Sequence, residues 1–228
     1  MEPLARGRAG GPDIDAGALR GRLDAGLAAM ALDLVPAARD RLIAYILLLE
    51  RWNRAYNLTG VRDPEEMISR HLLDSLSALP YVRGGRGLDV GSGAGLPGLV
   101  LAAVRPEVAW VLLDSNAKKC RFLAHATAEL GLDNVRVERS RLEDFHPGER
   151  FSTIISRALS NLADFVSGAR HLLASGGCLL AMKGRDPERE LAASGNWGGQ
   201  VEVVPVSLPD LADGQRHLVI VTRSVESN

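Results

Sequence analysis

The sequence predicts an α/β protein with a mostly parallel seven-stranded sheet, one antiparallel strand and a helical N-terminal segment. Apolar residues recur at helical spacing through the first third of the chain, and from Arg86 onward short apolar runs alternate with helical segments. Such alternation is typical of a parallel sheet with helices on both faces. Two apolar runs near the C-terminus have no helix between them, which predicts an antiparallel pair at one edge.

Length and composition indicate one globular domain with an extension. The chain has 228 residues, of which 46% are hydrophobic and 24% are charged. Its net charge of −1 gives no general attraction for nucleic acid, so any RNA contact needs a local basic patch. We expect a disordered lead-in over residues 1–15, a helical segment packed on the core over 16–80, and the main α/β domain over 81–228.

The cellular location follows from the absence of export and membrane signals. No apolar run is long enough to span a bilayer, and the first residues lack the apolar core of a signal peptide. Cys120 and Cys178 lie far apart without metal-ligand spacing, which is typical of reduced thiols. We therefore expect a cytoplasmic protein with no membrane segment and no metal.

Three helices are expected in the N-terminal segment. The first two follow from leucine and other apolar residues that recur about once per helical turn. In the third, Asp63 can cap the N-terminus and Pro64 suits the first turn. The expected helices cover residues 19–30, 36–52 and 63–80.

The remaining elements alternate along the main domain. Pro97 is expected to open the helix after the first strand, because its missing N–H needs no partner there. Gly131 is expected to end one later helix, and the pair Gly176-Gly177 another. The expected strands are Gly87–Val90, Val108–Leu113, Val135–Glu138, Thr153–Ser156, Cys178–Met182, Val201–Val206 and His217–Thr222, and the expected helices are Pro97–Val104, Asn116–Leu130 and Leu162–Leu173.

A glycine-rich turn follows the first strand and predicts a ligand site. Gly91, Gly93 and Gly95 come after Asp89, and glycines let the backbone approach a ligand without Cβ atoms in the way. This order is similar to the first motif of Rossmann-like class I S-adenosylmethionine-dependent methyltransferases. The same residues fit a dinucleotide fingerprint, or a structural turn without a ligand. Too little chain follows Lys183 for the substrate domain of a dehydrogenase, which disfavours a nicotinamide enzyme.

Further candidate ligand residues follow the next strands, at the carboxyl edge where doubly wound sheets bind ligands. Asp114 can accept hydrogen bonds from both ribose hydroxyls, and alternatively it or Ser115 can cap the following helix. Leu142 and Glu143 suit the apolar face and the amino group of an adenine. A solvated acidic loop fits the same two residues.

The residues after the fourth strand argue against two methyl-transfer chemistries. Enzymes that methylate the amino group of adenine or cytosine carry an Asn/Asp-Pro-Pro-aromatic turn there, whereas this chain has Ile155-Ser156-Arg157-Ala158. Cytosine C5 enzymes need a nucleophilic cysteine, and both cysteines are typical of packing residues. What remains is a methyl acceptor that needs no activation, such as guanine N7, whose lone pair carries no proton and needs only alignment with the methyl group. Arg157 is then the candidate catalytic residue, through guanine O6, the flipped base or its phosphate.

Several sequence blocks together resemble one family, the bacterial small-subunit ribosomal RNA guanine-N7 methyltransferases, also called glucose-inhibited division protein B. The blocks are Trp52–Thr59, Arg70–Ser75, Asp89–Gly98, Leu112–Ser115, Ile155–Ala158, Met182–Gly184 and Arg216–Val219. The resemblance implies S-adenosylmethionine as methyl donor and a guanosine in 16S ribosomal RNA as substrate, free or within the small subunit. It also implies cofactor contacts for Gly91, Leu96, Leu142, Glu143 and Arg157, which join Asp89, Gly93, Gly95 and Asp114 as candidate cofactor residues.

Candidate RNA-binding residues lie before the sheet and after the fifth strand. His71 and Asp74 are three residues apart on the third helix, where they can contact each other or form a wall of the substrate pocket. Cations on both sides of the sheet can supply the local phosphate patch. The candidate RNA-binding residues are Asn57, His71, Asp74, Lys183 and Arg185, and the further arginines of the patch are Arg54, Arg62 and Arg70.

Two other interpretations stay open. A ribosome assembly factor without activity would keep the same cofactor pocket. A small-molecule methyltransferase would need an enclosed, largely apolar pocket rather than an open basic rim. For the enzyme we expect a monomer.

Overall fold

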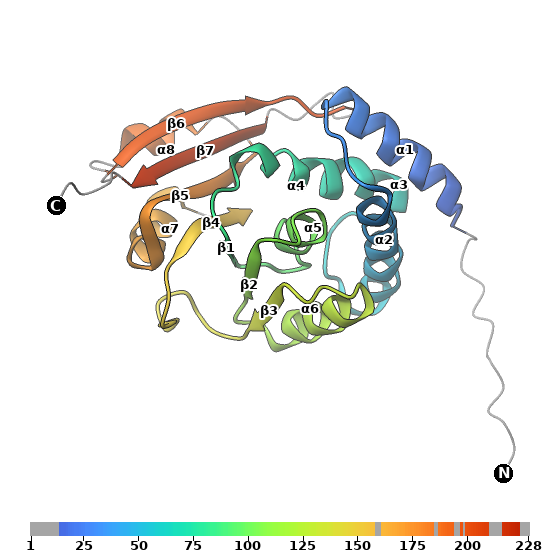
Figure 1. Ribbon diagram of the computed structural model, residues 1–228, viewed down its shortest axis with the longest axis horizontal. Coiled ribbons are helices and arrows are strands. Elements are labelled where there is room, and N and C mark those ends of the chain that lie inside the picture. The colour runs from blue at the N-terminus through green and yellow to red at the C-terminus, as the bar shows by residue number, and fades with distance from the viewer. Residues whose placement is uncertain are drawn as a thin grey trace, which may run out of the picture.

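A central sheet of seven strands is covered by helices in the computed structural model, which describes residues 14–157, 161–184, 187–193, 197, 199–209 and 216–223 (Figure 1). The strands are β1 Arg86–Val90, β2 Ala109–Leu113, β3 Val135–Glu138, β4 Phe151–Arg157, β5 Leu173–Lys183, β6 Gly199–Val206 and β7 Arg216–Arg223. Their order is β3-β2-β1-β4-β5-β7-β6. β1 to β5 pair in parallel and β7 is antiparallel to its two neighbours, which confirms the predicted mixed sheet.

Helices cover both faces of the sheet, as the alternation predicts. Side chains of successive strand residues point to opposite faces. Leu112 of β2 therefore packs in one apolar cluster, with the first helices of the chain, and its neighbour Val111 in a second cluster on the other face. The α-helices are α1 Ala16–Ala29, α2 Pro36–Tyr56, α3 Pro64–Met67, α4 Asp74–Leu76, α5 Gly98–Val104, α6 Ala117–Glu129, α7 Leu162–Ala169 and α8 Glu188–Ala193.

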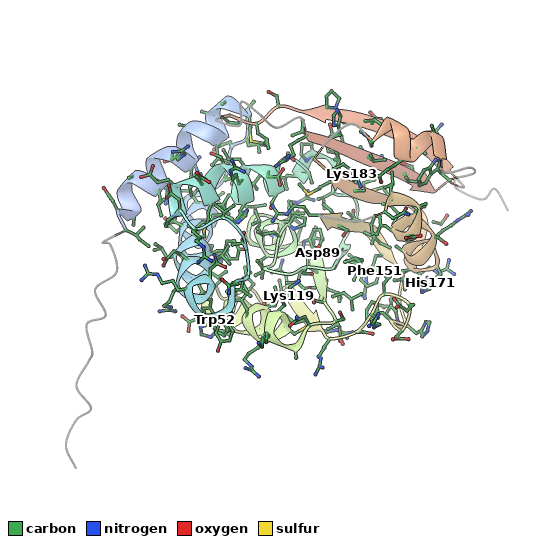
Figure 2. The ribbon with its side chains drawn as sticks, turned by 180° about the vertical axis from the view of Figure 1, so that it is seen from behind. Trp52, Asp89, Lys119, Phe151, His171 and Lys183 are labelled. Carbon is green, nitrogen blue, oxygen red and sulfur yellow. The ribbon has the colours of Figure 1, made fainter. Side chains whose placement is uncertain are left out.

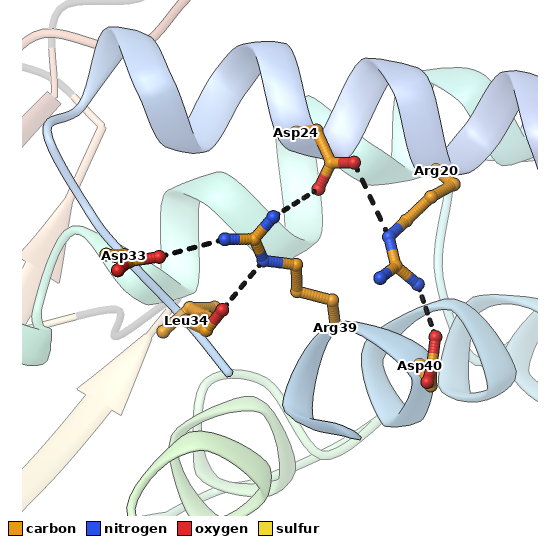
Figure 3. A network of polar contacts seen from close by, with 6 residues as sticks. All are labelled: Arg20, Asp24, Asp33, Leu34, Arg39 and Asp40. Carbon is orange, nitrogen blue, oxygen red and sulfur yellow. Dashed lines mark hydrogen bonds and ion pairs between the residues drawn. The ribbon is translucent and has the colours of Figure 1, made fainter. Parts of the chain in front are cut away.

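The first two helices are joined by a polar network (Figure 3). The guanidinium of Arg39 in α2 donates to the carbonyl of Leu34 at 2.8 Å, to Asp33 at 2.9 Å and to Asp24 of α1 at 3.2 Å. Arg20 of α1 pairs with Asp24 and also with a carboxylate at the start of α2. These contacts fix the turn between the helices, so that their leucines reach the core together.

The third predicted helix, over residues 63–80, is not one continuous α-helix. Its start is confirmed, because Asp63 accepts a hydrogen bond from the backbone of Glu65 at 2.9 Å and Pro64 is the first helical residue. A π-helical turn over Ile68–Leu73 then separates α3 from α4, and a 3₁₀ turn over Leu79–Tyr81 ends the segment. π-helical turns often occur at functional sites, and this one comes directly before α4, which begins with the candidate residue Asp74.

Two helix boundaries differ from the prediction. Pro97 is the residue before α5, which begins at Gly98, so the proline does not occupy the first helical position. The helix expected over Leu162–Leu173 is α-helical to Ala169 and continues as a 3₁₀ turn over Arg170–Leu172, and the chain from Leu173 onward, which includes Gly176-Gly177, pairs with β4. Tertiary strand pairing overrides the glycine signal there. Gly131 follows the last turn of α6 with φ +59°, as predicted.

The N-terminal helices share one apolar core with the sheet. The first cluster contains buried side chains from α1 and α2 together with others from α5, α6 and β7. The boundary at residue 80 stays a prediction. The disordered lead-in also stays a prediction, since residues 1–13 lie outside the described part of the chain. Within the described ranges, no helix is both long and apolar enough to cross a membrane.

Candidate active site

The glycine turn after β1 forms one wall of the site. Gly91, Gly93 and Gly95 have φ of +70°, +59° and +87°, a backbone region that side chains disfavour. A Cβ built on Gly91 would meet no atom within 4 Å, whereas one on Gly95 would lie 2.3 Å from the Leu99 side chain. Gly91 therefore leaves the backbone open to a ligand, and Gly95 allows close packing of the turn on α5.

Asp89 supports the turn from beneath. It is fully buried, near the middle of the view in Figure 2, and its Oδ2 accepts a hydrogen bond from the backbone of Gly98 at 2.9 Å. The Ser92 hydroxyl donates to the Asp89 carbonyl at 2.9 Å, and the Tyr45 hydroxyl donates to the Ala94 carbonyl at 2.7 Å. Burial raises the pKa of Asp89 to about 7, although the hydrogen bond from Gly98 opposes this shift.

Asp114 connects the end of β2 to the same turn. Its Oδ2 accepts a hydrogen bond from the backbone of Gly93 at 2.9 Å, and its Oδ1 accepts one from the backbone of Asn116 at 2.8 Å. The alternative role as N-cap is wrong, because the side chain of Asn116 caps α6 by accepting from Lys118 and Lys119. Asp114 is thus a nearly buried carboxylate next to the glycine turn.

A cavity of about 350 Å³ opens beside these residues. This volume is in the range of small-molecule sites in proteins. Four of the predicted cofactor residues, Gly91, Asp114, Leu142 and Glu143, line it, although they come from three different strand ends. The other lining residues are Val90, Leu113, Ser115, Lys119, Ser140 and Arg141.

Asp89, Gly93, Gly95 and Leu96 are the glycine-motif candidates that do not line the cavity, and Gly93 donates its backbone N–H to Asp114. Asp89 and Gly95 contact the chain itself, and the buried Leu96 packs in the apolar cluster on the α5 side of the sheet. These three residues shape the turn rather than the surface of the cavity. Their contact with a cofactor stays a prediction.

Arg157 ends β4, the strand that pairs with β1, and is not among the residues that line the cavity. Ser156 before it donates to the carbonyl of Val90, a cavity residue, at 2.6 Å. One nitrogen of the Arg157 guanidinium, Nη1, donates to the carbonyl of Arg70 at 3.1 Å and to Oδ2 of Asp74 at 3.1 Å. Oδ1 of Asp74 lies 3.4 Å from Nε of Arg216, which belongs to the sequence block Arg216–Val219. No local pattern predicts this contact between distant segments.

His71 and Asp74 have different partners, so the predicted contact between them is replaced by two others. Nε2 of His71 lies 2.8 Å from the hydroxyl of Thr59, while Asp74 binds Arg157. Burial and then the positive charge of Arg157 lower the pKa of His71 to about 4. His71 is therefore neutral at pH 7, and the loop that carries Thr59 is tied to the π-helical turn.

The other predicted RNA-binding residues have partners outside the contact between Asp74 and Arg157. Asn57 ends α2 in a left-handed conformation and accepts a hydrogen bond from Arg62 at 3.1 Å. Lys183 forms an ion pair with Glu190 of α8, at 2.8 Å, which offsets its charge. Arg185 lies outside the described residues.

Both cysteines are built into the core as packing residues. Cys120 donates to the carbonyl of Asp114, with the two atoms 3.2 Å apart, and Cys178 is completely buried in β5. Burial raises the pKa of both thiols, so neither favours the thiolate form. No group of three metal-binding side chains gathers within the described ranges.

Comparison with known proteins identifies the family of this site. The model of the family described as rRNA small subunit methyltransferase G, GidB, matches residues 38–219. The chain belongs to this family. A ribosomal RNA small subunit methyltransferase G from Alkalilimnicola ehrlichii is 51% identical over 197 residues, covering 86% of this chain and 89% of that protein. One from Chromohalobacter salexigens is 56% identical over 175 residues, covering 77% and 84%.

Solved structures confirm the fold class. A predicted O-methyltransferase from Agrobacterium tumefaciens has a TM-score of 0.56 at 20% identity, covering 67% of this chain and 81% of that one. Fibrillarin from Aeropyrum pernix, solved with bound S-adenosylmethionine, has a TM-score of 0.55 at 18% identity, covering 67% and 75%. The chain is an S-adenosylmethionine-dependent methyltransferase of class I, as the glycine turn predicts.

Proposed function

We propose that this methyltransferase methylates N7 of a guanosine in 16S ribosomal RNA. The observation that carries the proposal is the arrangement of the carboxyl edge, where the glycine turn and Asp114 bound a cavity and Arg157 stands at the end of the neighbouring strand β4. Family membership supports ribosomal RNA of the small subunit as the substrate. The open, polar cavity and the adjacent arginines favour a nucleic acid over a small apolar acceptor.

Residues of the cavity hold the cofactor. The open backbone at Gly91 leaves room for its methionine part, and Asp114 is the acceptor for the ribose hydroxyls. Leu142 and Glu143 flank the adenine, with an apolar contact and an acceptor for its amino group. Asp89, Gly93, Gly95 and Leu96 fix the shape of the turn that these contacts require.

The acceptor chemistry needs alignment and no general base. S-adenosylmethionine supplies a methyl group on a positively charged sulfur. The N7 lone pair lies in the ring plane without a proton, so the protein has to hold this atom in line and exclude water. Arg157 performs this positioning, either at O6 of guanine or at the backbone of the flipped nucleotide. The absence of a thiolate at Cys120 and Cys178 agrees with this direct transfer.

The RNA approaches from the side that carries Arg157. We expect Asn57, His71, Asp74, Lys183 and Arg185 to contact the RNA. The enzyme acts in the cytoplasm as a monomer, where both free 16S RNA and small subunits are present. A cofactor-binding assembly factor with the same pocket would bind the RNA without transferring a methyl group.

A methylation assay tests the proposal directly. Purified protein and labelled S-adenosylmethionine are incubated with 16S RNA, or with small subunits, from a strain that lacks the gene. Mass spectrometry of nuclease fragments is expected to show one guanosine that gains a methyl group at N7. Cofactor and RNA binding without methyl transfer would instead favour the assembly factor, and transfer to a metabolite extract alone would favour the small-molecule enzyme.

A further inference from the structure

One buried carboxylate contacts two arginines that are far apart in the sequence. Asp74 opens α4, Arg157 ends β4 and Arg216 begins β7. Oδ2 of Asp74 accepts a hydrogen bond from Arg157 at 3.1 Å, and Oδ1 lies 3.4 Å from Nε of Arg216. Each carboxylate oxygen therefore serves a different guanidinium. Asp74, Arg157 and Arg216 thus form one cluster.

The charges in this cluster do not balance. Two guanidinium groups share a single carboxylate, and the neighbouring His71 is neutral because its pKa is about 4. Arg70, whose carbonyl also binds Arg157, has its own ion-pair partner, Glu66, at 3.4 Å. Among the described residues, Asp74 is the carboxylate that pairs with both guanidinium groups, and the nearby Asp89, with a pKa of about 7, is only partly charged at neutral pH. Asp74 alone therefore does not neutralise the two arginines.

The guanidinium groups are also reachable from solvent. The side chains of Arg157 and Arg216 are 22% and 29% exposed, whereas that of Asp74 is 7% exposed. Arg157 uses Nη1 for its contacts with the described residues, among which Nη2 and Nε have no hydrogen-bond partner and can donate to a ligand. Donors that are charged, partly exposed and held by a buried anchor suit an anion with several oxygens.

We propose that Asp74 is a positioning residue that holds Arg157 and Arg216 as a pair, and that this pair binds one phosphate group of the RNA strand carrying the target guanosine. The inference rests on the proposed function and assigns Arg216 a role beyond it. Without Asp74 the two guanidinium groups repel each other and separate. With it they are held together at the carboxyl edge of the sheet, where the cavity also opens. The binding of this phosphate fixes the position of the nucleotide that enters the site.

The test measures RNA binding as a function of salt concentration. Each phosphate contact of a single strand contributes about 0.7 to the slope of log affinity against log salt. In the Arg216→Gln variant we expect the slope to fall by about this amount and the affinity for the RNA to fall about tenfold, equivalent to about 1.4 kcal/mol. The affinity for S-adenosylmethionine, measured by calorimetry, is expected to stay unchanged.

Two further variants separate positioning from folding. Asp74→Asn is expected to raise KM for RNA while leaving S-adenosylmethionine affinity intact. Arg216→Lys keeps the charge but not the planar fork, so it should restore the salt slope while restoring the affinity only in part. The matched control is Arg105→Gln, since Arg105 is 32% exposed, pairs with Glu107 and lies at the opposite edge of the sheet.

The results distinguish this inference from the proposed function. If Arg216→Gln lowers the melting temperature but leaves the RNA affinity and the salt slope at wild-type values, the cluster only ties the elements together and the inference is overturned. If the wild-type protein neither binds nor methylates the RNA, the proposed function fails, whatever the variants do. Equal losses in Arg216→Gln and Arg105→Gln would show a general charge effect and would also overturn the inference.

Discussion

The carboxylate of Asp114 accepts a hydrogen bond from the backbone of Gly93 at 2.9 Å, which ties the end of β2 to the turn that follows β1. The second carboxylate oxygen binds the backbone of Asn116 at the start of α6. One side chain thus fixes two of the segments that line the cavity. Because both segments depend on it, variants of Asp114 have to be compared with variants that disturb only the helix.

Asp114→Ala is expected to weaken S-adenosylmethionine binding by on the order of 1–3 kcal/mol, the loss typical of an unpaired polar group. Isothermal calorimetry measures this change. The control is Asn116→Ala, which removes the cap of α6 and is expected to cost about 1 kcal/mol of stability without a comparable loss of affinity. If both variants lose stability alone, Asp114 has a structural role only.

Gly91→Val is expected to abolish S-adenosylmethionine binding, because a branched side chain would occupy the open side of the turn. Valine at the positive φ of this position also carries backbone strain on the order of 1–3 kcal/mol, which glycine avoids. Gly131→Val is the matched control, since Gly131 has φ +59° with nothing near its Cβ position and lies outside the cavity lining. Normal cofactor affinity in Gly91→Val would show that the turn is not part of the binding site. Equal losses of stability in the two variants would show that backbone strain accounts for the whole effect on stability.

Much of the fold follows from local patterns, because apolar spacing and glycine or proline signals act within one element. The antiparallel pair of β6 and β7 and the cap at Asp63 are predicted in this way. The start of β5 at Leu173 is not, since pairing with β4 decides it. The contact of Asp74 with Arg157 joins residues 83 positions apart, so no spacing rule predicts it. The sequence predicts Gly91, Asp114, Leu142 and Glu143 as site residues, because their types and their places after strands indicate ligand binding. It does not predict the contacts that hold the site together, because these join distant segments.

Asp89 is expected to make the stability of the protein depend on pH. Burial raises its pKa from 3.8 to about 7, so between these values the folded protein keeps a proton that the unfolded chain releases. The free energy of unfolding therefore falls as pH rises through this range, by on the order of 4 kcal/mol from this group. His71 acts in the opposite direction, because its lowered pKa makes stability rise between about pH 4 and its ordinary value of 6.5.

Asp89→Asn isolates the contribution of Asp89. The amide keeps an oxygen for the Gly98 N–H and carries no charge, so the variant is expected to gain stability relative to wild type as the pH rises from 4.5 to 8. Urea unfolding at several pH values measures this difference. His71→Gln is the companion variant, and its difference from wild type should change with the opposite sign. A constant difference between Asp89→Asn and wild type at every pH would contradict the raised pKa.

Arg157→Lys is expected to slow methyl transfer by at least about tenfold, which corresponds to about 1.4 kcal/mol in the barrier. Lysine keeps the charge but loses the planar fork, so it cannot hold Asp74 and an RNA group at the same time. Arg157→Ala is expected to lose more activity, and it also leaves the nearly buried Asp74 with Arg216 as its remaining arginine partner.

Single-turnover methylation and melting temperature are measured on the same preparations, with Arg105→Ala as the control at the opposite edge. An arginine that only pins the end of β4 would lower stability and rate together, whereas one that positions the acceptor lowers the rate at unchanged stability in the lysine variant. An Arg157→Ala enzyme that is as stable and nearly as fast as wild type would remove Arg157 from the mechanism.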